Sequence, residues 1–240
     1  MKKIGVIGAM ETEVAALRSH LNPLEGRNSV EKCQKGGILF TEGILNGINV
    51  VVVKSGVGKV NAALCAQRLI VEFGCTHIIN TGIAGAMAEG LGVFDFVVSR
   101  DAVYHDMDAT GFGYKVGEIP QMECSRFMAD SEMIKAADKA FKMVKECEGH
   151  KLISGTVASG DQFISESAKK KYIEENFHPA CVEMEGCAIA HACYLNGTPF
   201  AVIRCMSDMA DETVEQTYNF NEDSAAAMSA GLVEQMITLI

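Results

Sequence analysis

The sequence lacks the features typical of a membrane protein or a nucleic-acid-binding protein. No apolar run approaches the ~20 residues that a membrane-spanning helix requires. The first apolar run, residues 4–10, meets Glu11 and Glu13 too early for a signal peptide. Lysine and arginine number 21 against 31 acidic residues, for a net charge of -10, whereas binding a polynucleotide requires a basic surface. We therefore expect a cytoplasmic protein with no membrane or nucleic-acid partner.

The sequence also lacks the motifs of common metal, redox and phosphate sites. None of its nine cysteines forms a C-x-x-C pair or has a histidine at zinc-ligand spacing. Because most lie in apolar stretches, we interpret them as reduced core thiols. The segment YHDMD at 104–108 has a single histidine, and SGVGKV at 55–60 departs from the phosphate-loop pattern. These absences predict an activity that uses neither metal nor cofactor.

The chain of 240 residues is 48% apolar and 22% charged, which is typical of a globular enzyme. With no linker, repeat or low-complexity tract, we expect one domain over residues 1–240. Strand and helix patterns alternate along it. Strands are predicted at 3–9, 38–44, 48–54, 77–81, 93–103, 152–158, 180–184 and 199–206, and helices at 11–21, 59–72, 131–147, 166–175, 185–196 and 222–240, with a long loop at 104–127. This alternation predicts a three-layer α/β/α fold around a mixed, mainly parallel sheet.

Unusual residues gather at four predicted strand ends: 8–13, 80–85, 182–185 and 204–208. In open α/β sheets, ligands bind beyond the carboxyl ends of the strands. The convergence of these four segments is therefore the main indication of a site in the sequence.

Two of these segments carry paired polar groups. In VEMEG, Glu183 and Glu185 flank Met184; either acid could cap the next helix, but a carboxylate also accepts two hydrogen bonds from a vicinal diol. In RCMSD, Ser207 or Asp208 could be a helix cap. An aspartate in a poorly solvated pocket would instead favour its protonated form and act as a general acid. Arg204, on the same strand, could orient a carboxylate or form a structural ion pair.

Two further segments complete the candidate site. In IGAMETEV, Glu13 lies on the first turn after a strand, where a surface acid favoured by the helix dipole is the ordinary alternative. In SGDQFI, Phe163 is either a core residue or a ring that stacks on a purine, and Asp161 could simply fix the turn.

Together, IGAMETEV, KSGVGKVNAA, NTGIAGA, SGDQFI, VEMEG and RCMSDMAD resemble the methylthioadenosine/S-adenosylhomocysteine nucleosidases of the nucleoside phosphorylase superfamily, in the same order over nearly the whole chain. The resemblance implies that Glu13 activates water, that Asp208 protonates adenine N7 and that Arg204 holds Glu13 and the water. It implies a binding site for the nucleoside formed by Met10, Val57, Ala84, Gly85, Phe163, Ile164, Glu183, Met184, Glu185 and Ser207. Phe112 and Pro120 would cover the alkylthio group across a homodimer, and Tyr218 or Phe220 would close the site.

One position departs from the family pattern. Ile83 stands in NTGIAGA where the family often has a serine whose hydroxyl joins the polar network near Glu13. The departure leaves both proposed acid–base residues in place, although it could lower the rate or alter substrate preference.

Several activities remain as alternatives. A nucleoside phosphorylase would need a cationic phosphate pocket, whereas the first strand ends in AMETE. A futalosine-type hydrolase would be a closer relative of this chain than a phosphorylase. A non-catalytic nucleoside-binding protein should lack Glu13 or Asp208, and a redox sensor should have a resolving cysteine pair. We therefore expect hydrolysis of the N-glycosidic bond of methylthioadenosine and S-adenosylhomocysteine, and of 5'-deoxyadenosine as well.

Overall fold

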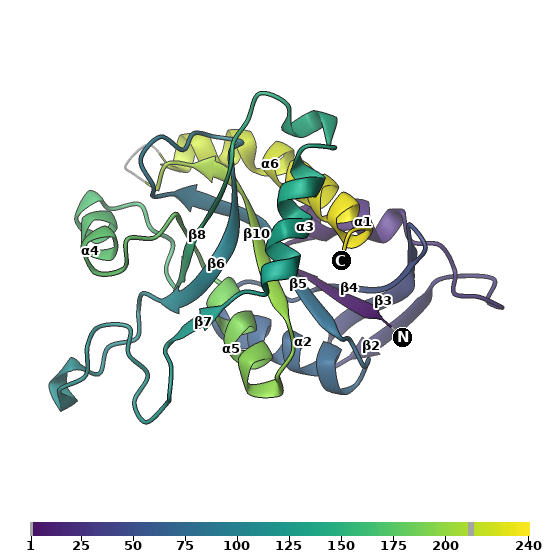
Figure 1. Cartoon of the computed structure of the whole chain (residues 1–240), viewed down its shortest axis with the longest axis horizontal. Coiled ribbons are helices and arrows are strands. Elements are labelled where there is room, and N and C mark those ends of the chain that lie inside the picture. Colours follow the sequence, from purple (N-terminus) through teal and green to yellow (C-terminus); the bar gives the residue numbers. More distant parts are fainter. Residues whose placement is uncertain (1, 211–213) are drawn as a thin grey trace.

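The computed structural model describes the backbone of residues 2–210 and 214–240 and the side chains of residues 2–210 and 221–240. One large sheet organises the described chain (Figure 1). Its strands are β1 (Lys3–Gly8), β2 (Glu31–Lys35), β3 (Ile38–Leu45), β4 (Ile48–Lys54), β5 (His77–Ala86), β6 (Phe96–Tyr104), β7 (Arg126–Met128), β8 (Leu152–Ser159), β9 (Cys181–Glu183) and β10 (Phe200–Asp208).

Helices follow most of the strands. The α-helices are α1 (Glu11–Ser19), α2 (Lys59–Val71), α3 (Ser131–Phe141), α4 (Ser167–Phe177), α5 (Gly186–Asn196) and α6 (Val214–Ile237), and short 3₁₀ turns span Thr110–Phe112 and Lys145–Cys147. Glycine ends α5 in a typical way, because Gly197 adopts the left-handed conformation that terminates many helices. None of the described helices has the length and hydrophobicity needed to cross a lipid bilayer.

The sheet is mixed, as expected. The strands run in the order β10-β6-β8-β9-β5-β1-β4-β3-β2, and β10 also pairs with β5, so that β10, β6, β8, β9 and β5 close into a ring. Parallel pairing joins β1 to β4 and β5, and β5 to β10. Because these strands share a direction, the carboxyl ends of β1, β5 and β10 meet at one edge of the sheet.

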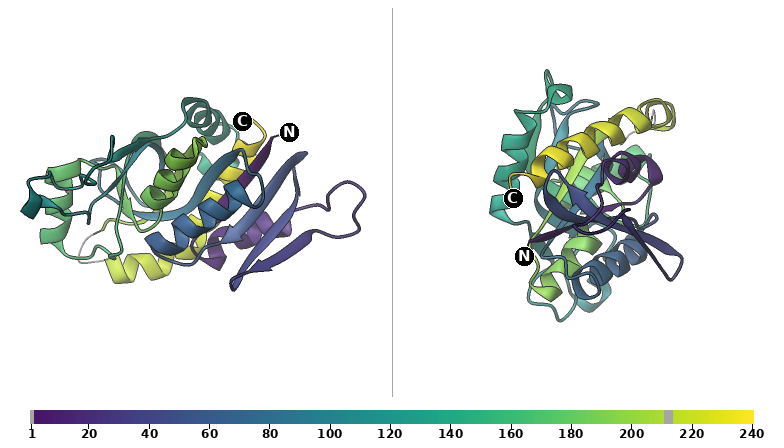
Figure 2. Two further views of the ribbon diagram at one scale, coloured as in Figure 1. Left: turned by 90° about the horizontal axis from the view of Figure 1, so that it is seen from below. Right: turned by 90° about the vertical axis from the view of Figure 1, so that its right-hand side faces the viewer.

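Helices cover both faces of the sheet and complete the predicted three layers (Figures 1 and 2). One apolar core joins the sheet to α2 and α5, through buried residues such as Cys65, Leu69 and Ile189. A second core on the other face joins it to α1, α3 and α6, through residues such as Leu17 and Val233. All nine cysteines are free thiols, in agreement with the sequence-based interpretation.

Some predicted boundaries were wrong. β2 and β7, which are short strands at the margins of the sheet, were not predicted from the sequence. β5 continues five residues beyond the predicted end at Thr81, because residues 82–85 pair with β10 and residues 85–86 pair with β9. The predicted helix at 131–147 ends at Phe141 and is followed by a separate 3₁₀ turn that buries Cys147.

Candidate active site

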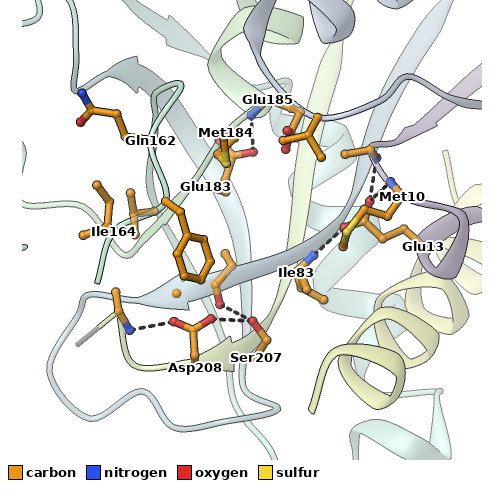
Figure 3. A pocket seen from close by; sticks show the side chains of 17 residues that line it. Met10, Glu13, Ile83, Gln162, Ile164, Glu183, Met184, Glu185, Ser207 and Asp208 are labelled. Atoms are coloured by element: carbon orange, nitrogen blue, oxygen red, sulfur yellow. Dashed lines mark hydrogen bonds between the residues drawn. The ribbon is translucent and has the colours of Figure 1, made fainter. Parts of the chain in front are cut away.

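A pocket with a volume of about 240 Å³ opens at the edge of the sheet where the strand ends converge (Figure 3). All four segments singled out in the sequence contribute to it. The lining consists of Ala9, Met10, Glu13, Val57, Ile83, Ala84, Gly85, Gln162, Phe163, Ile164, Val182, Glu183, Met184, Glu185, Ser207, Asp208 and Ala210.

Glu13 lies in the first turn of α1 and is held by three backbone N–H groups. Its Oε2 accepts hydrogen bonds from Ala9 N at 2.6 Å and Met10 N at 2.9 Å, and its Oε1 accepts one from Ile83 N at 3.1 Å. Burial raises the pKa of the Glu13 carboxyl, while the Arg204 charge and these hydrogen bonds oppose the rise. The result is a carboxylate that is fixed in position and readily accepts a proton.

Arg204 is only 1% exposed and forms a buried ion pair with Glu183. A second hydrogen bond joins its Nη2 to Asn80 Oδ1 at 2.7 Å. Arg204 influences Glu13 through its positive charge, which favours the ionised form of the Glu13 carboxyl, and its role in holding Glu13 stays a prediction. Its side chain lies behind the pocket wall and is absent from the lining.

Glu183 is occupied by this ion pair and by the start of α5. Its carboxylate accepts hydrogen bonds from the backbone N–H groups of Glu185 at 3.0 Å and Gly186 at 2.8 Å and from the Ser159 hydroxyl. Burial alone would raise the pKa of Glu183, but the charge of Arg204 and these hydrogen bonds outweigh burial and lower it. Glu183 thus combines the capping role with a position in the pocket wall.

Glu185 also faces the pocket, but fewer hydrogen bonds and a more distant cation offset its negative charge than that of Glu183. Gly58 N donates a hydrogen bond to its Oε1 at 2.8 Å, and Arg204 Nη2 lies 3.7 Å from its Oε2. Burial, together with the nearby charge of Glu183, raises the pKa of Glu185 to about 7. The neighbouring Met184 also lines the pocket, so that an apolar surface adjoins this carboxyl group.

Asp208 enters the pocket from the end of β10, on a different side from Glu13 (Figure 3). Its Oδ2 accepts a hydrogen bond from Ser207 Oγ at 2.7 Å, and its Oδ1 accepts one from Ala210 N at 2.8 Å. A hydroxyl group can donate to a carboxylate or accept from a carboxylic acid. Ser207 therefore serves Asp208 in either protonation state.

The loop after β8 supplies Phe163 and Ile164 to the pocket. Phe163 is 52% exposed, so its ring is not a core residue. The loop is tied to the start of α2, because Asp161 Oδ1 accepts a hydrogen bond from Lys59 N at 2.8 Å. This link joins the segment that carries Phe163 to the segment that carries Val57 and Gly58.

Some of the predicted residues are not part of this pocket. Phe112 is 88% exposed in the 3₁₀ turn at 110–112, and neither Phe112 nor Pro120 lines the pocket. The side chains of Tyr218 and Phe220 lie outside the described residues.

The pocket also contains residues that the sequence analysis did not select as site residues. Each of them lies within a motif quoted above, so membership of the motif was the available signal: Ala9, Gln162, Val182 and Ala210. Ile83, noted as a departure from the family, both lines the pocket and donates to Glu13. No group of three or more potential metal ligands occurs within the described part of the chain.

The family model of the phosphorylase superfamily matches residues 3–238, and the chain belongs to this superfamily. Within this superfamily it belongs with the 5'-methylthioadenosine/S-adenosylhomocysteine nucleosidases. The nucleosidase of Geobacillus sp. (strain WCH70) is 37% identical over 237 residues, which cover 98% of each chain.

Solved structures agree with this assignment. The corresponding nucleosidase of Colwellia psychrerythraea, in complex with adenine, has a TM-score of 0.92 at 38% identity, covering 99% of this chain and 95% of that one. The Neisseria meningitidis enzyme, in complex with methylthio-immucillin-A, has the same TM-score and identity, with both chains fully covered. A Helicobacter pylori futalosine hydrolase shares the fold, with a TM-score of 0.91, 28% identity and coverage of 100% and 98%.

Proposed function

We propose that this protein hydrolyses the N-glycosidic bond of 5'-methylthioadenosine and S-adenosylhomocysteine, releasing adenine and the thioribose. The observation that carries the proposal is that Glu13 and Asp208, from the two ends of the chain, line one pocket. Membership of the nucleosidase family supports the choice of substrates. We propose 5'-deoxyadenosine as a further substrate, because it has the same base, the same N-glycosidic bond and the same two ribose hydroxyls.

In the proposed reaction, Glu13 accepts a proton from water as the water attacks C1' of the sugar. The bond to N9 breaks through a cationic, oxocarbenium-like sugar. The negative charges of Glu13 and Glu185 favour this cation. Three backbone donors fix the Glu13 carboxylate, and its raised pKa brings its basicity closer to that suited to a general base at neutral pH.

Asp208 is the proposed general acid. Without protonation the adenine would leave as an anion, so a proton delivered to N7 removes the charge from the leaving group. Ser207 Oγ, 2.7 Å from Asp208 Oδ2, orients the carboxyl group before and after the transfer. Met10 and Phe163, which both line the pocket, are assigned to contacts with the sugar and the adenine ring.

Glu185 is the proposed ribose-binding residue, because a carboxylate can accept hydrogen bonds from two adjacent hydroxyl groups. One of its oxygens is already directed by Gly58 N, which sets the plane of the carboxyl group. The backbone of Ile164 is assigned to the edge of adenine, as the family resemblance implies. Val57, Ala84, Gly85 and Met184 supply the apolar walls.

Water is the proposed nucleophile rather than phosphate. None of the pocket-lining residues in the described part of the chain is a lysine or an arginine, whereas three are glutamates and one is an aspartate. Arg204, the nearest guanidinium, is buried against Glu183. A phosphate ion would therefore meet an acidic pocket without a cation free to bind it.

We further propose that two copies of the chain form a homodimer in the cytoplasm. Phe112 is almost fully exposed, and large apolar side chains on α2 and α5, including Val60, Leu64 and Leu195, are exposed as well. Covering such side chains favours association. In the dimer, Phe112 and Pro120 of one copy would reach the alkylthio end of the other copy's pocket. Two measurements on wild type and on Phe112→Ala test this arrangement. Sedimentation reports whether the dimer forms, and KM for methylthioadenosine reports whether Phe112 contributes to substrate binding.

The decisive experiment measures adenine release from methylthioadenosine in phosphate-free buffer. The wild-type protein should hydrolyse methylthioadenosine and release a free sugar rather than a sugar phosphate, whereas Glu13→Gln should show almost no turnover. Glu11→Gln, a change at an exposed acid in the same helical turn, is the matched control and should resemble wild type. Turnover that requires phosphate would identify a phosphorylase, and a preference for futalosine would identify the other hydrolase. Binding without turnover by wild type would leave only a nucleoside-binding protein.

A further inference from the structure

Helix α6 makes a buried polar contact with the backbone beside each of the two proposed acid–base residues. Ser229 reaches β5 next to the segment that holds Glu13, and Asn221 reaches β10 next to Asp208. Both side chains are buried, and neither lines the pocket. We propose that Asn221 and Ser229 are positioning residues, through which α6 sets the placement of the acid relative to the base. This inference rests on the proposed function.

Ser229 acts on the base side of the pocket. Its Oγ accepts a hydrogen bond from Gly82 N at 3.2 Å and lies 2.9 Å from Thr81 Oγ1. The pairing of β1 with β5 ends at Ile7 and Asn80. Beyond that point, backbone N–H groups of β5 donate hydrogen bonds to side chains. Gly82 N donates to Ser229, and the N–H of the next residue, Ile83, donates to Glu13. Ser229 thus fixes the Thr81–Gly82 peptide, which directly precedes the peptide whose N–H, at Ile83, is donated to Glu13.

Asn221 acts on the acid side. Its Nδ2 donates a hydrogen bond, at 3.1 Å, to the carbonyl oxygen of Ser207, which belongs to the peptide bond leading into Asp208. Ser207 also donates to the Asp208 carboxylate through its side chain. Asn221 therefore holds the backbone from which both the acid and its hydroxyl partner project.

Close packing of α6 makes these short contacts possible. Three alanines at positions 225, 226 and 230 are buried against the sheet. The distance between packed elements depends on the side chains at the contact, and small ones allow a close approach. Since α6 packs across both β5 and β10, a rigid helix links the two strand ends at a fixed separation.

Single substitutions test the two contacts. Asn221→Leu replaces the hydrogen-bond donor with an apolar side chain of similar size, and Ser229→Ala removes the hydrogen-bond acceptor. Because a displacement of about 1 Å in an active site can lower the rate ~10²-fold, each change should lower kcat at least about 10-fold, with KM for methylthioadenosine altered less than about twofold. Ser224→Ala, a change at an exposed serine of the same helix, is the control and should match wild type.

Double substitutions separate positioning from general destabilisation. Ser229→Ala should lose most of its effect on kcat when combined with Glu13→Gln, and Asn221→Leu should lose its effect when combined with Asp208→Asn. The effects on kcat should remain additive in the two other combinations, Ser229→Ala with Asp208→Asn and Asn221→Leu with Glu13→Gln. Substitutions that act on one catalytic group have non-additive effects, whereas independent substitutions have additive effects. Additive effects in all four combinations, or kcat values equal to wild type in both single variants, would overturn the proposal.

Two further measurements keep the outcome interpretable. Ser229→Cys retains a weak acceptor for Gly82 N and should recover part of the kcat that Ser229→Ala loses. Recovery of the melting temperature without recovery of kcat would indicate a purely structural serine and would count against the inference. If wild type itself releases no adenine, the proposed function fails first; if wild type is active and the variants match it, only this inference fails.

Discussion

Gly82 and Glu13 are in such close contact that any side chain at position 82 would have to displace the Glu13 carboxylate. A Cβ atom built there would lie 2.3 Å from Glu13 Oε1 and 2.7 Å from Arg204 Nη1. Real Cβ atoms do not approach polar atoms so closely, and both neighbours are buried. The glycine therefore allows the carboxylate of the proposed base to lie directly against β5, where Ile83 N can reach it.

We predict that Gly82→Ala lowers kcat for methylthioadenosine by about 10²-fold, since the new methyl group must displace the Glu13 carboxylate by roughly 1 Å or more. Steady-state assays of adenine release provide the measurement. Gly231→Ala is the control, because a Cβ atom at this helical position meets no atom within 4 Å. An active Gly82→Ala enzyme would show that the position of Glu13 is not critical.

The location of the site could be predicted from the sequence because it depends on strand direction. Parallel strands bring their carboxyl ends to one edge, so unusual residues after the strands at 3–9, 77–81 and 199–206 had to lie near one another. The pocket contains all four segments selected in this way. The alternation of strand and helix patterns, supported by the family resemblance, predicted the layered fold.

The partners of individual side chains could not be predicted in this way. The ion pair of Arg204 with Glu183 joins β10 to β9, and the contact of Gly82 with Glu13 joins β5 to α1. Such pairs depend on register and on rotamers that no local pattern encodes. β2 was missed for a related reason, because its polar sequence EKCQK forms a strand only by pairing with β3.

The buried ion pair of Arg204 with Glu183 should be important for the stability of the folded protein. Removing one partner of a buried pair leaves a charge without compensation and costs about 3–5 kcal/mol. Arg204→Met should therefore lower the free energy of unfolding by about this amount in urea titrations. Adding Glu183→Gln to this variant should restore part of the loss, because no buried charge then remains at either position.

An exposed pair provides the comparison for this experiment. Lys142 and Asp138 form an ion pair on the surface of α3 and its C-terminal end. Such pairs contribute about 0–1 kcal/mol, so Lys142→Met should have little effect on unfolding. If Arg204→Met costs no more than Lys142→Met, the buried pair does not stabilise the fold.

Replacing the proposed acid should slow the reaction without abolishing binding. We expect Asp208→Asn to lower kcat by ~10²–10⁴-fold, the usual contribution of general acid catalysis. The asparagine retains an oxygen that can accept from Ala210 N, so the turn after β10 should persist. Calorimetric titration with a non-hydrolysable methylthioadenosine analogue should give an affinity close to that of wild type. Asp223→Asn, at an exposed position of α6, should leave kcat unchanged.

Glu185 should make the stability of the ligand-free protein depend on pH. Burial and the neighbouring Glu183 raise its pKa from 4.5 to about 7. Below about pH 4.5 the carboxyl group is protonated in the folded and the unfolded protein, and its contribution to stability is then fully present. Between pH 4.5 and 7 the folded protein keeps a proton that the unfolded chain has lost, so the free energy of unfolding falls as the pH rises.

Glu185→Gln should remove this dependence. We predict that the free energy of unfolding of wild type falls relative to Glu185→Gln between pH 4.5 and 7, by at most about 3 kcal/mol. Urea titrations across this range measure the difference, and Glu89→Gln, at an exposed position, should follow wild type. A constant difference between wild type and Glu185→Gln would mean that folding does not raise the pKa of Glu185. In that case the carboxylate would already be charged before the ribose hydroxyls bind, and KM for methylthioadenosine should not fall as the pH rises through 7.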